Sequence, residues 1–574
     1  MAINEIPLLF FHAIRLDLAA VSYIAGLPIL LWIINQYISN KSIVLFNRIF
    51  IVTILPIAGF IMLMNLIVFQ AWGTIINARA ISFLSSPTEV FASMTSLQIV
   101  IAILLILLLS IGIIKFYDQF TSKSFSTPSS SKKHFVWLWI LVLPIFIRGG
   151  IQQIPINESV CMFSKNENTN LATINPFWYL LNSLFKSQNI DKNAYHFIDD
   201  NLAKQNYEKL YYGKSDSCLT IIANSKPNII TIVLESWTAD VIQSMGGEKG
   251  VTPFFNSLEN EGLLFDHIYA AGKRTDLMFP SLFSGFPAMP NISVIKYSDK
   301  TIHLPFITHS IKKQGYQTSF NYGGELEFAN MKSYLTQAAF DVIQGKESFP
   351  IEKWTSKWGV YDEELFDKSL SSIHQLKQPF FSVILTQSTH EPFAIPIPPK
   401  FQGTGESVKF KNAAYYTDCC LKLFFEKIKN EPWYNNTLIL LVADHGHILP
   451  RNRDYSEQAA FRIPLLITGP ALKSEYLHKR ISNIGNQQDY AATMKSILNL
   501  QIDLPFSNNL LNINRTNFCY MNFDNGFNWK TDHTTIKYNY SSKSAQPLEN
   551  PIDSTDIHQG WSFIQSAYQY FVKL

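Results

Sequence analysis

The chain has 574 residues, of which 47% are hydrophobic and 16% are charged, with a mean hydropathy of +0.06. Soluble domains carry about a quarter charged residues, so this composition excludes a disordered or fibrous chain and indicates a membrane-embedded part. The net charge of +3 provides no broad basic surface for nucleic acid. Five cysteines, with no C-x-x-C pair, argue against a disulfide scaffold and a zinc knuckle.

The apolar residues concentrate in residues 1–150, which we predict to be a transmembrane domain. Segments 18–38, 49–71 and 92–114 contain no charged residue, and each is long enough for a membrane helix, which needs about 20 residues. A fourth run, 135–147, can span only if the following arginine lies at the membrane interface. We expect about four membrane helices, with a fifth left open.

The loop charges predict the orientation of these helices. Four lysines lie between the third and fourth runs, and Lys41 and Arg48 lie between the first two. Basic loops face the cytoplasm. Everything after about residue 150 is therefore expected outside the cytoplasmic membrane, so the protein would be a multi-pass membrane protein with an extracytoplasmic, periplasmic domain.

The rest of the chain divides into three parts. Residues 151–225 are polar and irregular apart from the helical INPFWYLLNSLF, and we predict a linker with membrane-proximal helices. In residues 226–505 the apolar strands NIITIVL, FSVILT and TLILLVA alternate with amphipathic helices, which predicts an α/β domain with a mostly parallel, doubly wound sheet. Residues 506–574 are predicted to form a C-terminal subdomain of short strands and a terminal helix.

Cysteine pairing stays open at this point. Cys161 and Cys218 flank most of the predicted linker, and an oxidising compartment would permit a disulfide between them. Two free thiols explain the sequence equally well.

Candidate site residues follow the apolar strands. Glu235 and Ser236 follow NIITIVL, Asp444 and His445 follow TLILLVA, and His390 lies shortly after FSVILT. In open α/β sheets the site lies outside the carboxyl ends of the strands. Two carboxylates and an imidazole suit manganese, zinc or magnesium. Taken singly, each acidic residue could instead be a helix cap or a solvated strand end.

Thr275 is the candidate nucleophile. A neutral threonine hydroxyl is a poor nucleophile, and a bound metal would lower its pKa. The preceding Lys273 and Arg274 could attract an anionic substrate. Thr275 could also be a helix N-cap with Asp276 in the first turn, and the two roles are compatible because a cap residue projects its hydroxyl from the helix end.

These motifs carry a family resemblance. LESW, GKRTD followed by PSLFSG, THEPF and ADHGH occur in this order. In this combination the chain resembles the alkaline phosphatase/sulfatase superfamily, and within it the lipoteichoic acid synthase-like branch of phosphoglycerol and phosphoethanolamine transferases. That branch combines N-terminal membrane helices with an extracytoplasmic sulfatase-like domain, so the resemblance covers almost the whole chain.

The resemblance implies a role for each matched residue. One divalent ion, Mn²⁺ or Mg²⁺ with Zn²⁺ as an option, would be bound by Glu235, Thr275, Asp444 and His445. Thr275 would attack the phosphorus of a phospholipid headgroup, release diacylglycerol and form a phospho-threonine intermediate. An envelope glycan or lipid would then accept the headgroup. His390 would contact the phosphate or act in acid/base chemistry, and His447 would either assist in substrate binding or be structural.

Two departures from the sequence patterns of the family narrow the range of reactions that the chain is expected to catalyse. TDLMFPSLFSG lacks the Cys/Ser-x-Pro-x-Arg of sulfatases, which disfavours sulfate-ester hydrolysis. Glycerol-phosphate polymerases carry His-Gly and Trp-x-Arg where this chain has NYGGELEFANM, with Tyr322, Ala329 and Met331 in those places, which puts polymerisation in doubt. Tyr322 and Glu325 are expected to contact the substrate. Glu325 and Glu327 could face a cationic headgroup such as phosphoethanolamine, unless they are surface carboxylates.

The sequence thus predicts a membrane-anchored, metal-dependent transferase. It would move a phosphoglycerol or phosphoethanolamine headgroup from a phospholipid donor to an envelope glycan or lipid. A phosphodiesterase or phosphatase on the same scaffold and a non-catalytic, membrane-tethered binding module are the alternatives. No nucleic-acid partner is expected.

Overall fold

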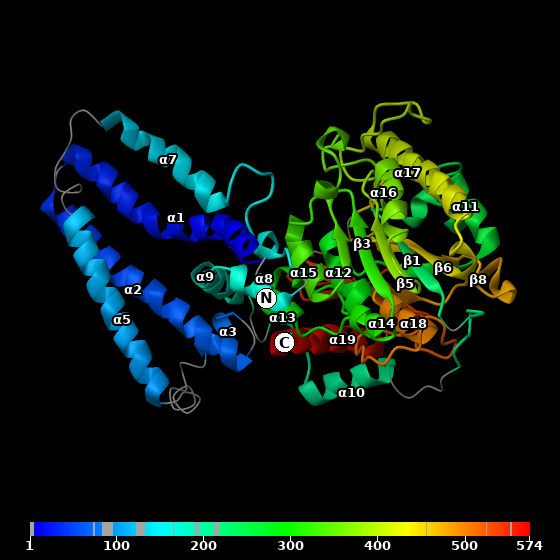
Figure 1. Ribbon diagram of the computed structural model, residues 1–574. Helices are drawn as coiled ribbons and strands as arrows, with labels where there is room; N and C mark the ends of the chain where they lie inside the picture. The colour runs from blue at the N-terminus through cyan, green and yellow to red at the C-terminus, as the bar shows by residue number, and fades with distance from the viewer. Residues whose placement is uncertain are drawn as a thin grey trace. The chain divides into compact units, whose positions relative to one another are not determined.

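The computed structural model of the chain describes residues 5–38, 40–72, 75–82, 96–121, 133–164, 166–188, 190, 194–211, 217–224, 226–454, 456–523, 525–550 and 554–574. It divides into two compact units, Met1–Asp191 and Lys192–Leu574. The helices of the first unit and the mixed helices and strands of the second can be followed in Figure 1. The division differs from the predicted boundaries, because the membrane-proximal helices before residue 191 belong to the first unit.

The first unit is helical. Its longer helices are α1 (Ile6–Ile38), α2 (Lys41–Trp72), α5 (Ser96–Phe116) and α7 (Lys133–Arg148). Among the described residues, Ile6–Ile38 and Lys41–Gln70 are long and apolar enough to cross a membrane, and Leu138–Arg148 is a shorter apolar helix. α5 covers most of the third predicted span, whose first residues, 92–95, lie outside the described part, as do two of the four lysines used for orientation. The described residues thus contain two candidate spans where four or five were expected.

The membrane-proximal segment folds onto these helices. It contains η4 (Glu158–Cys161), α8 (Glu167–Thr173) and α9 (Pro176–Ser187), with the short α3 (Ala78–Ser82) beside it. The Asn175 side chain accepts a hydrogen bond from the backbone N–H of Trp178 at 3.0 Å, and Pro176 follows it, which together start α9. Cys161 is buried in the resulting core, Cys218 is exposed, and no disulfide joins them, so the structure has the unbridged alternative.

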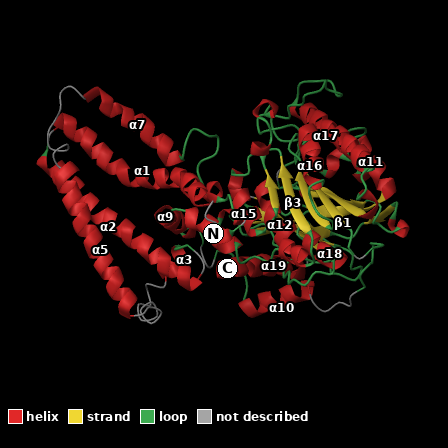
Figure 2. Cartoon of the chain, viewed as in Figure 1, coloured by secondary structure: helices red, strands yellow, loops and turns green. Residues whose placement is uncertain are grey.

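The second unit is built on a mixed sheet, shown in Figure 2. The strand order is β4-β3-β5-β1-β6-β7-β2-β8, with β9 also paired to β2. Their bounds are β1 (Asn228–Leu234), β2 (Gly262–Tyr269), β3 (Gln317–Tyr322), β4 (Val342–Gln344), β5 (Phe380–Leu385), β6 (Thr437–Ala443), β7 (Arg462–Thr468), β8 (Lys479–Ile481) and β9 (Gly485–Asn486). The strands from β4 to β6 are parallel, whereas β7 runs antiparallel to both neighbours.

Helices cover this sheet on both faces, as fully buried strands such as β1 and β6 require. The covering helices include α11 (Pro253–Leu258), α12 (Thr275–Ser284), α13 (Ser298–Thr301), α14 (Ile307–Lys313), α15 (Met331–Gln337), α16 (Asp362–Ile373), α17 (Glu406–Ile428) and α18 (Asp489–Ile497). α16 packs on β3, β5 and α17, and α12 packs against α18. The predicted α/β architecture is confirmed.

The chain ends in a second, antiparallel sheet with a long helix. The strands β10 (Phe518–Phe523), β11 (Gly526–Thr531), β12 (Thr535–Asn539) and β13 (Ser544–Pro547) pair in sequence order. The terminal helix α19 (Ser554–Lys573) packs beside α10 (Asp200–Tyr211). Met521 and Phe523 of β10 share a core with Phe461 and Tyr269, so this sheet is continuous with the α/β core rather than a separate body.

Candidate active site

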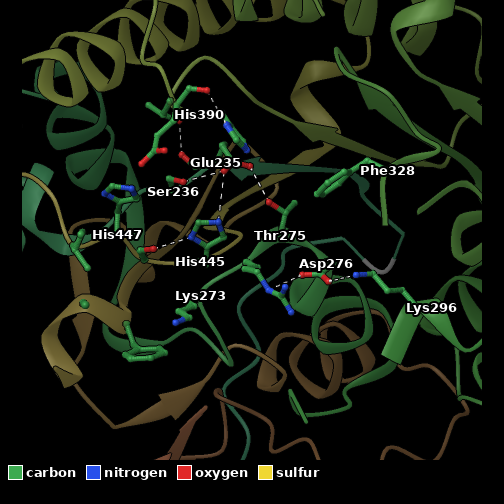
Figure 3. A pocket seen from close by; sticks show the side chains of 17 residues that line it. Glu235, Ser236, Lys273, Thr275, Asp276, Lys296, Phe328, His390, His445 and His447 are labelled. Carbon is green, nitrogen blue, oxygen red and sulfur yellow. Dashed lines mark hydrogen bonds and ion pairs between the residues drawn. The ribbon is translucent and has the colours of Figure 1, made fainter. Parts of the chain in front are cut away.

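Three potential metal ligands converge at the carboxyl ends of two neighbouring strands, and Glu235 and His445 can be seen in Figure 3. Glu235 follows β1, and Asp444 and His445 follow β6. Because β1 and β6 are parallel with Leu234 paired to Ala443, the residues after them lie side by side. One ligand atom from each of Glu235, Asp444 and His445 lies within 4.8 Å of the others, and all three side chains are buried.

Asp444 supplies the observation that tests whether a cation fits. Its Oδ1 accepts hydrogen bonds from the backbone N–H groups of Ser236 and His445, each at 2.7 Å. Its Oδ2 is buried and has no hydrogen-bond partner among the described residues. Burial, reinforced by the nearby Glu235, raises the pKa of Asp444 to about 7. A buried carboxylate oxygen without a partner is costly, and a cation would supply the missing interaction.

His445 is oriented to offer a lone pair. Its Nδ1 lies 2.7 Å from the carbonyl oxygen of Gly446. A carbonyl only accepts, so Nδ1 carries the proton in this contact, and the neutral ring would then offer the lone pair of Nε2 to a cation. Nε2 lies 3.6 Å from Glu235 Oε1 and 3.4 Å from Asp444 Oδ2. This arrangement is typical of metal-binding histidines, whose second nitrogen is held by a carbonyl or carboxylate.

Neighbouring carboxylates set the pKa of His445, and a close backbone contact restricts the residue type at position 446. Burial alone would lower the pKa of His445, but the carboxylates of Asp444 and Glu235 outweigh burial and raise it. A side chain at position 446 would place its Cβ 1.9 Å from the carbonyl oxygen of Ala460. Only glycine therefore fits the turn that carries the D-H-G-H motif.

Thr275 points at this cluster from the first turn of α12. Its hydroxyl donates to Glu235 Oε2 at 3.2 Å, and the hydroxyl of Ser236 donates to Glu235 Oε1 at 2.9 Å. Ser236 has a left-handed backbone with φ of 60°, a strained conformation that is concentrated at functional sites. Arg274 rather than Thr275 occupies the N-cap position, so the N-cap role for Thr275 is wrong, while Asp276 lies in the first turn as expected.

Basic side chains line the pocket beside Thr275. Lys273, Arg274 and Lys296 all lie on its wall. The buried carboxylate of Asp276 lies 3.5 Å from Arg274 Nε and 3.9 Å from Lys296 Nζ, so it holds two cations near the start of α12. Cations and a helix N-terminus both favour a phosphate group. Lys296 was missed by sequence reasoning because only the tertiary fold brings it to Asp276.

His390 and His447 line the same pocket but have different surroundings. The ring centroid of His390 lies 4.4 Å from that of Trp358, and burial lowers the pKa of His390. The ring of His447 stacks on Phe410 at 4.6 Å, and its Nδ1 accepts the Leu449 N–H at 3.0 Å. Burial, with the neighbouring histidines, lowers the pKa of His447 to about 3. His447 is therefore neutral and held in place by packing.

Two predicted substrate contacts are not on the pocket wall. Glu325 forms an ion pair with Lys346, with 2.9 Å between Oε2 and Nζ. The Tyr322 side chain packs beside Gly324, and neither Tyr322 nor Glu325 lines the pocket. Phe328 lines it instead. The expected contact between Glu325 and a cationic headgroup is not supported, because Lys346 already compensates that charge.

The loop after β5 holds the backbone at Glu235, a role that was not predicted from the sequence. The hydroxyl of Thr386 accepts the backbone N–H of Glu235 at 2.9 Å, and the hydroxyl of Thr389 donates to the Glu235 carbonyl. The buried Asp362 accepts the backbone N–H groups of Gln387 and Ser388 at 2.8 and 3.2 Å. The polar run T-Q-S-T directly after a buried strand was the available signal.

A family model described as Sulfatase matches residues 227–500, the range that contains every residue of this site. A solved structure described as a protein in the alkaline phosphatase superfamily from Vibrio parahaemolyticus shares 25% identity and a TM-score of 0.57, and the match covers 67% of this chain and 98% of that structure. This chain contains a sulfatase domain of the alkaline phosphatase superfamily. The resemblance drawn from the motifs is thereby confirmed.

The sulfatase domain is homologous to lipoteichoic acid synthases and phosphoglycerol transferases. "Lipoteichoic acid synthase-like YvgJ" of Bacillus subtilis is 26% identical over 398 residues, which is 65% of this chain and 64% of that protein. "Phosphoglycerol transferase I" of Citrobacter koseri is 28% identical over 243 residues, which is 39% of this chain and 31% of that protein. The matches therefore leave a third or more of each relative's length uncovered.

Proposed function

We propose that this chain is a membrane-anchored transferase that moves a phosphoglycerol headgroup from a membrane phospholipid to a hydroxyl group of an envelope glycan or lipid. The names of the homologues support the reaction class. The two candidate spans support the membrane anchor, and the loop charges support a catalytic domain outside the cytoplasmic membrane. We further propose that the enzyme is multi-pass and that Thr275 is its nucleophile.

One observation carries the proposal: the Thr275 hydroxyl lies 3.2 Å from Glu235, whose carboxylate forms a buried ligand set with Asp444 and His445. The unpartnered Asp444 Oδ2 and the lone pair of His445 Nε2 are donors that suit a divalent cation. Mn²⁺, Mg²⁺ or Zn²⁺ held by Glu235, Asp444, His445 and Thr275 would lower the pKa of the threonine hydroxyl.

The reaction would proceed in two displacements at phosphorus. In the first, the Thr275 oxygen forms a bond to phosphorus while the bond from phosphorus to the diacylglycerol oxygen breaks, and the threonine proton ends on that leaving oxygen. In the second, the acceptor hydroxyl forms a bond to phosphorus, the bond to Thr275 breaks, and the acceptor proton returns to the threonine. His390 lies on the pocket wall, and we propose that it carries these protons.

The basic wall of the pocket would bind the phosphodiester. Lys273, Arg274 and Lys296 lie beside Thr275, and Asp276 fixes two of them. Fixed cations stabilise the charge on the phosphoryl oxygens without reorganising during the reaction. Phosphoethanolamine is the less favoured headgroup, because the carboxylate proposed to recognise it, Glu325, is paired with Lys346.

The test is headgroup transfer by the full chain in liposomes with phosphatidylglycerol labelled in its headgroup. Thr275→Ala should reduce diacylglycerol release by about a thousandfold or more, because it removes the nucleophile. Thr275→Ser keeps a hydroxyl and should retain measurable release. Undiminished release by Thr275→Ala would refute the covalent mechanism.

The same assay separates the alternatives. A transferase places the label on an added glycolipid acceptor, and a hydrolase leaves it all as free glycerol phosphate. A binding module releases no diacylglycerol with saturating Mn²⁺ or Zn²⁺.

A further inference from the structure

An exposed apolar strip borders the pocket of the sulfatase domain. It lies in residues 346–358, KESFPIEKWTSKW, which we call the 346–358 loop. Ile351 is 75% exposed, Trp354 is 37% exposed, and the pocket-lining Phe328 beside the loop is 42% exposed. We propose that this loop docks the domain on the surface of a bilayer rich in anionic phospholipid. The inference deepens the proposed function and rests on it for the identity of the lipid.

Contacts link the first residue of the loop to the segment that leads to the pocket. The Nζ of Lys346 lies 5.2 Å from the ring centroid of Trp354 and 2.9 Å from Oε2 of Glu325. Glu325 opens the short segment that leads to Phe328 on the pocket wall, labelled in Figure 3. Trp354 is therefore linked through Lys346 to Glu325, three residues before the pocket-lining Phe328.

The other end of the loop contacts the pocket directly. The ring centroid of Trp358 lies 4.4 Å from that of His390, and the Trp358 indole N–H donates to the carbonyl of Glu391 at 2.5 Å. His390 and Glu391 both line the pocket. The last residue of the loop thus lies against the pocket, so a surface that meets the pocket mouth on this side comes close to the loop.

The loop's side chains have the chemistry of a membrane interface. Trp354 donates its indole N–H to the carbonyl of Phe349 at 3.2 Å, so its polar atom is satisfied while part of the ring stays exposed. The ammonium group of Lys357 lies 4.8 Å from the Trp358 ring centroid. Lys346 and Lys353 are paired with Glu325 and Glu364, and the loop also carries Glu347 and Glu352. Its tryptophan and isoleucine side chains suit the headgroup region, where apolar groups insert, and the ammonium group of Lys357 would meet a lipid phosphate.

The position of the 346–358 loop near the pocket favours a bilayer rather than a protein as the surface that it binds. Thr275 must reach a phosphorus that stays at the bilayer surface while the diacylglycerol part remains in the membrane. The pocket mouth then has to approach within a headgroup of the bilayer. Its edge carries Lys273 and Arg274, whose charge complements an anionic lipid surface. Exposed apolar residues at this edge are explained if they enter that surface.

The test compares two forms of the donor. The full chain would be assayed on long-chain phosphatidylglycerol in liposomes and on monomeric dioctanoyl phosphatidylglycerol in detergent. Ile351→Ser combined with Trp354→Ser should lower kcat/KM on the bilayer substrate by about tenfold, because two interfacial contacts are lost, and should change the monomeric substrate by less than about twofold. Ile513→Ser is the matched control, since Ile513 is 57% exposed and does not line the pocket.

A second readout needs no turnover. In liposomes with brominated lipid, the full chain should lose tryptophan fluorescence that the Trp354→Phe protein does not lose. Equal quenching of both proteins, or an equal rate loss on monomeric and bilayer donors, would overturn the docking proposal. Absence of any turnover by the unmodified chain would instead overturn the proposed function, and the quenching would still test the loop.

Discussion

At the scale of single residues, two adjacent glutamines show which contacts build the site. Gln487 is buried, and its side-chain nitrogen donates to the carbonyls of Ala443 and Asp444 at 2.8 and 2.6 Å. Its side-chain oxygen accepts the backbone N–H of Ala271, four residues before Thr275, at 3.4 Å. Gln488 is fully buried, and neither side-chain polar atom has a partner among the described residues. Gln487, unlike Gln488, therefore connects the backbone of Asp444, a proposed metal ligand, to the segment that leads to Thr275, the proposed nucleophile.

Substituting methionine at each position separates positioning from burial. Gln487→Met leaves two buried carbonyls without donors, which costs about 1–3 kcal/mol of stability. It should also weaken Mn²⁺ binding by about tenfold or more, as losses of residues supporting metal ligands do. Isothermal titration with Mn²⁺ measures the affinity, and chemical denaturation measures the stability.

Gln488→Met is the matched control for this prediction. It removes unpaired polar atoms from the core at nearly constant shape, so stability should be unchanged or higher and Mn²⁺ affinity should be unchanged. A loss of Mn²⁺ affinity as large in Gln488→Met as in Gln487→Met would contradict the positioning role.

At the scale of elements, the strand ends were predictable and the partners that complete the site were not. The runs before Glu235 and Asp444 are mostly apolar, so sequence alone predicts β1 and β6 and the residues at their carboxyl ends. Gln487 and Lys296 carry no local signal, because their contacts exist only after α12, β9 and the loops around them pack. The antiparallel direction of β7 could not be predicted from the sequence for the same reason, because its apolar run resembles that of a parallel strand.

Glu325 shows the reverse case, in which the sequence suggested a contact and the fold supplies a different partner. Its expected contact with a headgroup rested on charge alone, and Lys346, which compensates it, follows β4 on a separate segment.

The small C-terminal sheet provides a pH test. Glu549 pairs with Lys530 of β11 at 2.8 Å and accepts the Thr535 hydroxyl of β12 at 2.7 Å. Burial would raise the pKa of Glu549, but the hydrogen bonds from Lys530, Thr535 and Gln458 lower it from 4.5 to about 2. A lowered folded-state pKa means that the stabilisation is complete above the unfolded-state value and is lost as the pH falls through the folded-state value.

We therefore expect the free energy of unfolding of the unmodified chain to exceed that of Glu549→Gln at pH 6. The difference should shrink between about pH 4.5 and pH 2. Denaturant unfolding of both proteins across this range measures it. A difference that stays constant with pH would show that the carboxylate charge is not the stabilising feature.

At the scale of the whole molecule, the chain combines an apolar helical unit with a sulfatase domain whose site contains two buried carboxylates. The carboxylates of Glu235 and Asp444 are both buried, with one imidazole between them. Without a cation they repel each other in a low-dielectric site. The stability of the domain should therefore depend on a divalent ion.

Metal removal tests this dependence. Mn²⁺ at a hundredfold excess over its dissociation constant should stabilise the chain by about 2.7 kcal/mol relative to EDTA. Asp444→Asn removes one charge, so this protein should show little response to Mn²⁺ and should be at least as stable as the unmodified chain in EDTA. Thermal unfolding of both proteins with and without Mn²⁺ measures this stabilisation. An equal Mn²⁺ response in both proteins would place the ion elsewhere.

The most direct test of the central claim is mass spectrometry of the peptide that contains Thr275. The full chain would be incubated with phosphatidylglycerol and Mn²⁺, quenched in acid and digested. A threonine oxygen attacking phosphorus beside Glu235, Asp444 and His445 predicts a phosphoglycerol adduct on Thr275, formed with Mn²⁺ and absent with EDTA or in Asp444→Asn. Diacylglycerol release with no adduct on Thr275 at any quench time, or an adduct on another residue, would contradict the account.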